Sequence, residues 1–119
     1  MVKKSKNIVV AEDDADGRRL ILDTLKYVGH QVQGAKDGQE ALELILRDAN
    51  INMLITDIKM PKMDGYELID ALYVKKYRFP IIVCSAGCDL KRIQYEGTVE
   101  FISKPYDYNQ LLKMVRTAK

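Results

Sequence analysis

The sequence is short of the residues that build disulfide frameworks and zinc sites. Its 119 residues include two cysteines, Cys84 and Cys88, one histidine and no tryptophan. This set gives neither a disulfide scaffold nor four ligands for a structural zinc ion. We therefore expect both thiols to be reduced, with Cys84 serving as a small apolar residue at the end of a buried strand rather than as half of a redox pair.

Long apolar runs and a strong excess of one charge are also missing. No run approaches the ~20 apolar residues that a membrane-spanning helix needs. The formal net charge of +2 is too small to indicate a nucleic-acid-binding protein. The first residues pass directly into the strand-like run Ile8–Ala11, without a separate signal segment. We expect a cytoplasmic protein that makes no direct contact with nucleic acid or membrane.

The length and composition fit one folded domain. With 47% hydrophobic and 30% charged residues, the chain resembles ordinary globular proteins rather than disordered ones. A chain of 119 residues can bury one core and is too short for two. Since there is no linker, internal repeat or low-complexity tract, we predict a single domain over residues 1–119.

Short apolar runs alternate with segments of helical periodicity. Three of the five runs are nearly continuous, as is typical of strands covered on both faces. The predicted strands are Ile8–Ala11, Gln31–Ala35, Met53–Thr56, Ile81–Cys84 and Val99–Ile102. Apolar residues three and four apart indicate a helix after each strand, of which the fourth, at Asp89–Tyr95, is short and poorly patterned. This alternation predicts an α/β fold with a doubly wound five-stranded parallel sheet and five helices.

The ends of these strands carry acidic, basic and hydroxyl side chains. In open parallel sheets, sites form beyond the carboxyl ends of the strands, where the strand order reverses. The first strand leaves Glu12 and Asp13 there, the third Asp57, the fourth Ser85 and the fifth Lys104. We expect these five side chains to meet at one edge of the sheet.

The chemistry of this set is that of phosphoryl transfer. Three carboxylates at close range repel each other unless a cation joins them, and Mg²⁺ binds such oxygens while leaving room for water and phosphate. The ammonium of Lys104 suits a phosphate oxygen, and the hydroxyl of Ser85 adds a hydrogen-bond donor. We interpret Asp57 as the nucleophile, which would form an aspartyl phosphate.

With these residues in place, the chain resembles the receiver domains of response regulators in two-component signalling systems, the CheY-like proteins. The resemblance runs from "IVVAEDD" through "DGQEAL", "LITDIKMPKMDGYEL" and "IIVCSA" to "FISKPYD". The block "TDIKMPKMDG", with an acidic pair upstream and Lys-Pro downstream, is highly specific for this family. The resemblance implies the flavodoxin-like strand order 2-1-3-4-5.

The resemblance also implies roles for the acidic residues. Asp57 matches the phosphoacceptor, which is also a metal ligand. Asp13 matches the direct Mg²⁺ ligand, and Glu12 the acid that acts through a metal-bound water. The backbone carbonyl of Lys59 matches the third protein oxygen on the metal. From its position, the side chain of Lys59 is hypothesised to overhang the acceptor and to modulate the attack of water on the phosphoryl group.

The remaining matches concern the response to phosphorylation. Ser85 matches the hydroxyl residue that turns toward the phosphate, Lys104 the cation on another phosphate oxygen, and Phe101 the conformationally coupled aromatic. The implied donor is a histidine kinase or a histidine phosphotransfer protein, and the implied receiver of the signal is a downstream protein target or output domain. The one histidine, His30, is expected to be a half-exposed strand residue rather than a phosphotransfer histidine.

Two other functions are compatible with parts of the pattern. A phosphatase with an aspartyl-phosphate intermediate generally needs a second acid two residues after the nucleophile, where this chain has Lys59. A receiver-like interaction module that is never phosphorylated is the main alternative. We expect no enzyme acting on a metabolite, but a phosphoacceptor domain that assists its own phosphorylation and dephosphorylation. The sequence leaves open whether the domain stands alone or is a piece of a larger protein.

Two local features call for separate interpretations. The segment "EDDADG" has acids spaced partly as in a calcium loop, but Asp14 and Asp16 are expected to cap the first helix instead. The interval from Ser85 to Lys104 is shorter than usual for the family. One hypothesis is an atypical output face lined by aromatic residues, and the alternative is that these residues cover the core edge; they are Tyr95, Phe101, Tyr106 and Tyr108.

Overall fold

The computed structural model describes residues 5–119 and contains five parallel strands in the order β2-β1-β3-β4-β5. The predicted doubly wound sheet and its strand order are confirmed; residues 1–4 of the predicted domain lie outside the described part of the chain. The strands are β1 (Asn7–Ala11), β2 (Gln31–Ala35), β3 (Met53–Thr56), β4 (Ile81–Ser85) and β5 (Val99–Ser103).

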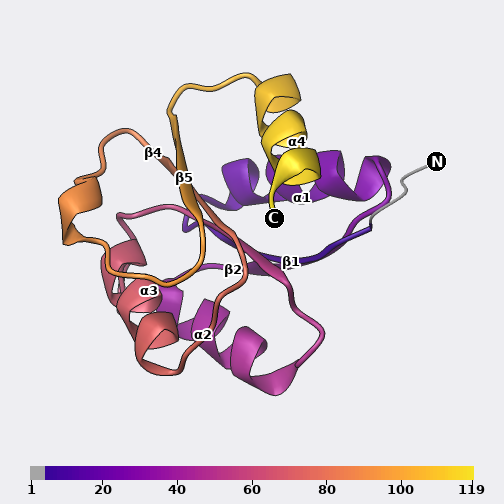
Figure 1. The fold of residues 1–119 in the computed structure, drawn as a ribbon. Coiled ribbons are helices and arrows are strands. Elements are labelled where there is room, and N and C mark those ends of the chain that lie inside the picture. Colours follow the sequence, from indigo (N-terminus) through magenta and orange to yellow (C-terminus); the bar gives the residue numbers. More distant parts are fainter. Residues whose placement is uncertain (1–4) are drawn as a thin grey trace.

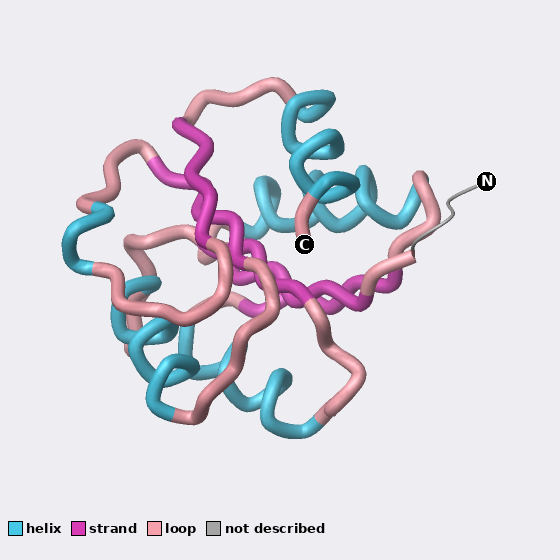
Figure 2. Tube along the Cα trace, in the orientation of Figure 1, coloured by secondary structure: helices cyan, strands magenta, loops and turns pink. Residues whose placement is uncertain are grey.

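Two pairs of helices cover the two faces of the sheet (Figure 1). The helices α1 and α4 lie on one face, and α2 and α3 lie on the other; the trace in Figure 2 shows the strands passing between the two pairs. No helix among residues 5–119 is long and apolar enough to cross a membrane. The helices are α1 (Ala15–Tyr27), α2 (Gly38–Arg47), α3 (Gly65–Val74) and α4 (Tyr108–Thr117).

The continuous apolar strands are explained by two separate hydrophobic clusters. Ile8 and Val10 of β1 belong to the cluster under α1 and α4, whereas Val9 and Ala11 belong to the cluster under α2 and α3. Successive side chains of a strand point to opposite faces, so a strand that is covered twice needs apolar residues at every position. All four residues are at most 1% exposed.

Each of the four α-helices begins at an aspartate. The side chains of Asp14, Asp37, Asp64 and Asp107 each accept a hydrogen bond from a backbone N–H of the first turn, and Asp64 forms a capping box with Glu67. Such caps are typically worth about 1 kcal/mol each. Asp14 therefore caps a helix, as expected for "EDDADG".

The prediction of a fifth helix at Asp89–Tyr95 is wrong. This segment contains only one 3-10 turn, η1 (Leu90–Arg92), which Asp89 caps by accepting a hydrogen bond from the amide of Lys91. A helix of this length forms too few internal hydrogen bonds to offset the cost of nucleation. The segment also lacks a continuous apolar stripe that could hold a helix against the sheet.

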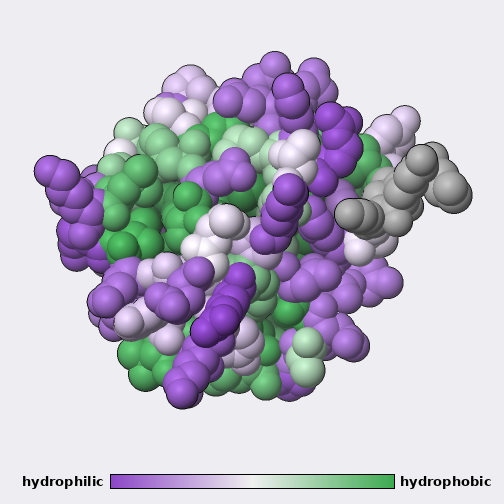
Figure 3. Space-filling view, viewed as in Figure 1, coloured by the Kyte–Doolittle hydropathy of each residue, from purple (hydrophilic) through white to green (hydrophobic). Residues whose placement is uncertain are grey.

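The four aromatic residues near this segment do not form one cluster. Tyr95 and Phe101 pack against the cluster under α2 and α3, whereas Tyr106 and Tyr108 pack against the cluster under α1 and α4. Hydrophobic surface does gather at the left of Figure 3, where Figure 1 places the connection between β4 and β5. The arrangement agrees with tyrosines that cover two sides of the core edge, and it does not support a single aromatic face.

His30 lies at the start of β2, at the opposite end of the strands from Asp57. It is 7% exposed, so the expectation of a half-exposed residue is wrong. Its Nδ1 accepts a hydrogen bond from the backbone amide of Lys6, with 3.1 Å between the two nitrogens. Burial, together with the positive charge of Lys6, lowers the pKa of His30.

We predict that His30 makes the fold less stable in mild acid. In the unfolded chain His30 binds a proton near the ordinary pKa of 6.5, whereas in the folded chain it binds one only at lower pH. The free energy of unfolding therefore falls as the pH drops below the unfolded pKa and through the lower folded pKa. In His30→Asn, which keeps an acceptor but does not titrate, the free energy of unfolding should fall less between about pH 7 and pH 5. Urea unfolding of both proteins at several pH values measures this, and parallel pH curves would contradict it.

Candidate functional site

Asp57 follows β3 directly and is fixed by main-chain hydrogen bonds. Its backbone amide donates to the carbonyl oxygen of Ala11 at 2.9 Å, which extends the pairing of β3 with β1. Its Oδ1 accepts a hydrogen bond from the amide of Ile58 at 2.6 Å. The residue is 9% exposed. A nearly buried carboxylate is therefore held at the carboxyl edge of the sheet.

The loop that leaves Asp57 returns close beneath it at Gly65. The amide of Gly65 donates to the carbonyl oxygen of Ile58 at 2.8 Å, at the start of α3. A Cβ atom at this position would lie 2.3 Å from the carbonyl oxygen of Asp57, closer than any side chain permits. The glycine of "MDG" is thus required by the close approach of two backbone segments.

Glu12 and Asp13 follow β1 and bring two more carboxylates to the same place. One oxygen from each of Glu12, Asp13 and Asp57 lies within 4.8 Å of the others. Glu12 is 4% exposed, whereas Asp13 faces solvent. The predicted meeting of these three acids is what the structure shows.

Two neighbours of Glu12 were not anticipated from the sequence. The amide of Asp14 donates to Glu12 Oε2 at 3.1 Å, and Nη1 of Arg18 donates to the carbonyl oxygen of Glu12 at 2.8 Å. Arg18 lies in α1, so its reach back to the end of β1 depends on how the helix packs. The one sequence signal for these two contacts is that a helix starts immediately after "AEDD".

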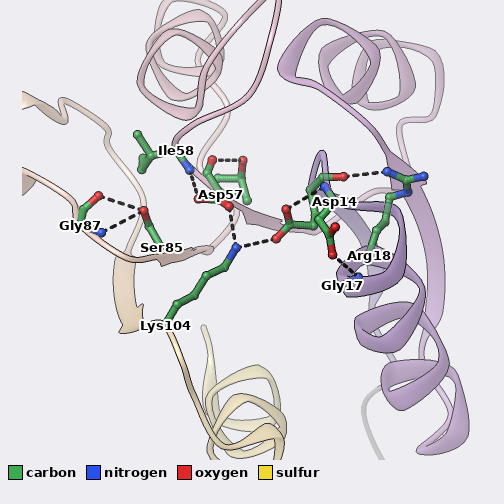
Figure 4. A network of polar contacts seen from close by, with 10 residues as sticks. Asp14, Gly17, Arg18, Asp57, Ile58, Ser85, Gly87 and Lys104 are labelled. Carbon is green, nitrogen blue, oxygen red and sulfur yellow. Dashed lines mark hydrogen bonds and ion pairs between the residues drawn. The ribbon is translucent and has the colours of Figure 1, made fainter.

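The ammonium of Lys104 lies between two of the carboxylates (Figure 4). Its Nζ is 2.7 Å from Glu12 Oε1 and 2.6 Å from Asp57 Oδ2. Its backbone amide donates to the carbonyl oxygen of Ser85 at 2.9 Å, which keeps the end of β5 beside β4. Partial burial by itself would lower the pKa of Lys104, but the hydrogen bonds to Asp57 and Glu12 outweigh it and raise the pKa above its ordinary value.

The other three predicted site residues are Ser85, Lys59 and Phe101. In the described part of the chain, none of them forms a hydrogen bond or an ion pair with the side chain of Asp57. The hydroxyl of Ser85 donates to the carbonyl oxygen of Gly87 at 2.9 Å and points away from Asp57 in Figure 4. Within the described residues, no hydrogen bond joins Ser85 to Asp57. Lys59 is exposed in the loop after β3. Phe101 pairs with Val83 across β4 and β5 and is partly buried under the α3 side of the sheet.

The acidic cluster fits Mg²⁺. Its donors are carboxylate oxygens, the ligand type this ion prefers, and the exposure of Asp13 leaves room for the waters that the ion usually retains. The three acids come from the ends of two neighbouring strands, so the backbone rather than flexible side chains sets their spacing. Glu12, Asp13 and Asp57 are the side chains that could hold the ion.

The two cysteines are free thiols. Cys84 is 2% exposed in β4, and burial raises its pKa to about 12. A thiol with this pKa stays protonated and unreactive near neutral pH. The interpretation of Cys84 as a small buried apolar residue is therefore confirmed.

The sequence profile of the response regulator receiver domain matches residues 8–116. The chain belongs to this family. Receiver domains of response regulators are generally signalling domains rather than enzymes. The fold described above is that of the family, and the acidic cluster fits the acidic pocket at which receiver domains bind Mg²⁺.

Individual relatives support the same assignment. The chain is 33% identical over 117 residues to a probable transcriptional regulator, ycf27, of Porphyridium aerugineum, covering 96% of this chain and 48% of the relative. It is 31% identical over 107 residues to the sensor histidine kinase RcsC of Salmonella typhi, covering 87% of this chain and 11% of the relative. This receiver domain thus spans about half the length, or less, of these relatives.

Solved structures share the fold. The chemotaxis protein CheY4 of Vibrio cholerae superposes with a TM-score of 0.86 at 24% identity, covering 98% of this chain and 100% of that one. The CheX–CheY complex of Borrelia burgdorferi, which contains BeF3 and Mg, gives a TM-score of 0.84 at 26% identity, covering 96% and 90%.

We predict that Lys104→Ala destabilises the receiver domain when divalent ions are chelated. The substitution leaves the buried carboxylates of Glu12 and Asp57 without a shared cation, which should lower the free energy of unfolding by about 1–3 kcal/mol. Added Mg²⁺ should recover part of the loss, because a second cation then joins the acids. Urea unfolding measures both effects.

The matched control is Lys113→Ala, which removes an exposed lysine from α4. It should be nearly neutral, since isolated surface charges contribute little. Equal stability of the two variants would mean that the contacts of Lys104 contribute nothing to the fold.

Proposed function

We propose that this receiver domain, residues 1–119, is a signalling switch that accepts a phosphoryl group on Asp57. The observation that supports this most directly is the meeting of Glu12, Asp13, Asp57 and Lys104 at one edge of the sheet. Four charged side chains from three strands have no need to converge for the sake of the fold alone. Their combination suits an acceptor carboxylate, an oxygen-ligated cation and a phosphate-binding ammonium.

In the proposed reaction, an oxygen of Asp57 bonds to phosphorus as the bond between phosphorus and the donor's leaving atom breaks. Asp13, Asp57 and the backbone carbonyl of Lys59 would hold the Mg²⁺ ion directly, and Glu12 would hold it through a water. Bound Mg²⁺ supplies positive charge that neutralises the phosphoryl oxygens. Lys104 exchanges its contact with the Asp57 carboxylate for one with a phosphoryl oxygen, so its charge stays paired throughout.

The proposed response begins at Ser85. A phosphoryl group adds about −2 charge beside Asp57. The hydroxyl of Ser85, which donates to Gly87 in the present structure, would turn to donate to the phosphoryl group. Phe101 would follow inward and change the surface formed by the β4–β5 connection, β5 and α4. The conformational change is thus a local electrostatic event that biases a two-state element.

The proposed partners are those that membership of the receiver family implies. The donor is a histidine kinase or a histidine phosphotransfer protein, and the buried His30 at the far end of the sheet is not part of the transfer. The receiver of the signal is a downstream protein target or an output domain. Action on phosphate monoesters is disfavoured, because Lys59 stands where such an enzyme carries its second acid.

We predict that acetyl phosphate with Mg²⁺ adds one phosphoryl group to Asp57. Intact mass spectrometry should show one adduct, and peptide mapping should place it on Asp57. Asp57→Asn, which keeps the shape of the side chain but removes the nucleophile, should show none. Absence of an adduct on the wild type, while another receiver domain is labelled in parallel, would favour an interaction module that is never phosphorylated.

We further predict that Lys59→Ala loses its phosphoryl group faster than the wild type. Removing a long exposed side chain beside the acceptor should ease the approach of water, with an effect of at most about fivefold, since an exposed charge is worth about 1 kcal/mol or less. Loss of the adduct over time measures the rate. The control is Lys75→Ala, which removes an exposed lysine at the other end of α3. Equal rates of dephosphorylation in the wild type and both variants would contradict a role for Lys59.

A further inference from the structure

The segment that contains η1 is attached to α3 through two tyrosines. The hydroxyl of Tyr66 accepts a hydrogen bond from the backbone amide of Asp89 at 2.7 Å, and the guanidinium carbon of Arg92 lies 3.9 Å from the centre of the Tyr66 ring. Further along the segment, the hydroxyl of Tyr73 accepts from Nε2 of Gln94 at 3.1 Å. The segment is therefore fixed by side-chain contacts to a neighbouring helix, since it has almost no helical hydrogen bonds of its own.

The first of these attachments is close to the site along the chain. Only Ala86, Gly87 and Cys88 separate Ser85 from Asp89. Ser85 is joined to Gly87 twice, because its hydroxyl donates to the carbonyl oxygen of Gly87 and accepts from its amide at 3.3 Å. The loop that leaves β4 is thus held at one end by Ser85 and at the other by Tyr66.

These two attachments lie at the two ends of one short loop, so we expect them to be coupled. If Ser85 turns toward a phosphoryl group on Asp57, both of its hydrogen bonds to Gly87 break and the loop changes shape. With only three residues between the two attachments, we expect a change in the loop at Gly87 to displace the amide of Asp89 relative to α3. The hydrogen bond from the Asp89 amide to Tyr66 and the stacking of Arg92 on the Tyr66 ring would then form in the resting conformation and weaken in the phosphorylated one.

We propose that Tyr66 is a positioning residue for Ser85: by holding Asp89 and Arg92 on α3, it stabilises the resting conformation of the β4–β5 connection and opposes the turn of Ser85 toward the phosphoryl group. The inference rests on the proposed function of Asp57. It assigns to a residue of α3, outside the charged cluster, control over how readily the switch operates.

The expected consequence is a shift in population. A group that binds only the active conformation binds more weakly when the resting one is favoured. Loss of the Tyr66 hydroxyl should therefore increase the apparent affinity for a phosphoryl analogue by roughly two- to twelve-fold, the range expected for the loss of one neutral hydrogen bond. Tyr73 holds the segment beyond η1, farther from Ser85, so loss of its hydroxyl should have little effect.

The test uses beryllofluoride with Mg²⁺ as the phosphoryl analogue. The apparent affinity is measured by titration of ¹⁵N-labelled wild type, Tyr66→Phe and Tyr73→Phe, with the amide signals of Gly87 and Asp89 as readout. Tyr66→Phe keeps the ring under Arg92 and removes only the hydroxyl. Arg92→Gln, at an exposed position, loosens the same attachment without touching the hydroxyl. Melting temperatures of all four proteins show whether the variants are folded alike.

The inference is supported if Tyr66→Phe and Arg92→Gln bind the analogue more tightly than the wild type while Tyr73→Phe does not. In free Tyr66→Phe, the Gly87 signal should also have moved toward its position in the bound wild type. Equal affinity of wild type and Tyr66→Phe, or equal gains in both tyrosine variants, overturns the inference while the proposed function stands. A wild type that binds no analogue and accepts no phosphoryl group overturns both.

Discussion

The ammonium of Lys104, held between the carboxylates of Glu12 and Asp57, is the interaction on which the arrangement of the site depends. These two acids are at most 9% exposed, and their charges lie at the ends of adjacent strands, where they would repel each other. A cation from β5 joins them. The lysine thereby ties the last strand to the first and third at the edge of the sheet where the acidic residues meet.

The shared lysine also suits the proposed role of the site as a switch. Because Lys104 pairs with two acids, a new negative charge at Asp57 would give its ammonium a different partner. A second cation at the site would compete with Lys104 for both carboxylates. The hydroxyl of Ser85 lies on β4, between the strands that carry these charges, and is engaged with Gly87 at rest. In the proposed mechanism, an exchange of ionic partners at Asp57 reaches the loop after β4 and, through the bond of Tyr66 to Asp89, the surface of α3.

The strands and the acidic residues could be predicted from the sequence, whereas the connection between β4 and β5 could not. Two-sided burial favours nearly continuous apolar runs in β1, β3 and β4, interrupted only at Asn7, Thr56 and Ser85 at the strand ends, and this pattern is visible without coordinates. The segment around Leu90–Arg92 has no such pattern, and its conformation is determined by Tyr66 and Tyr73, residues distant in sequence. Similarly, His30 is buried and accepts a hydrogen bond from the backbone amide of Lys6, a residue 24 positions earlier in the chain.

The sequence alone determined the alternation of strands and helices, the caps at the helix starts and the identity of the charged residues at the strand ends, because these depend on local periodicity and side-chain chemistry. Tertiary structure decided which atoms meet: the ammonium of Lys104 between two acids, the hydroxyl of Ser85 on Gly87 rather than on Asp57, and the attachment of the η1 segment to α3. Such contacts join residues far apart along the chain. Only the packing of the helices on the sheet brings them together.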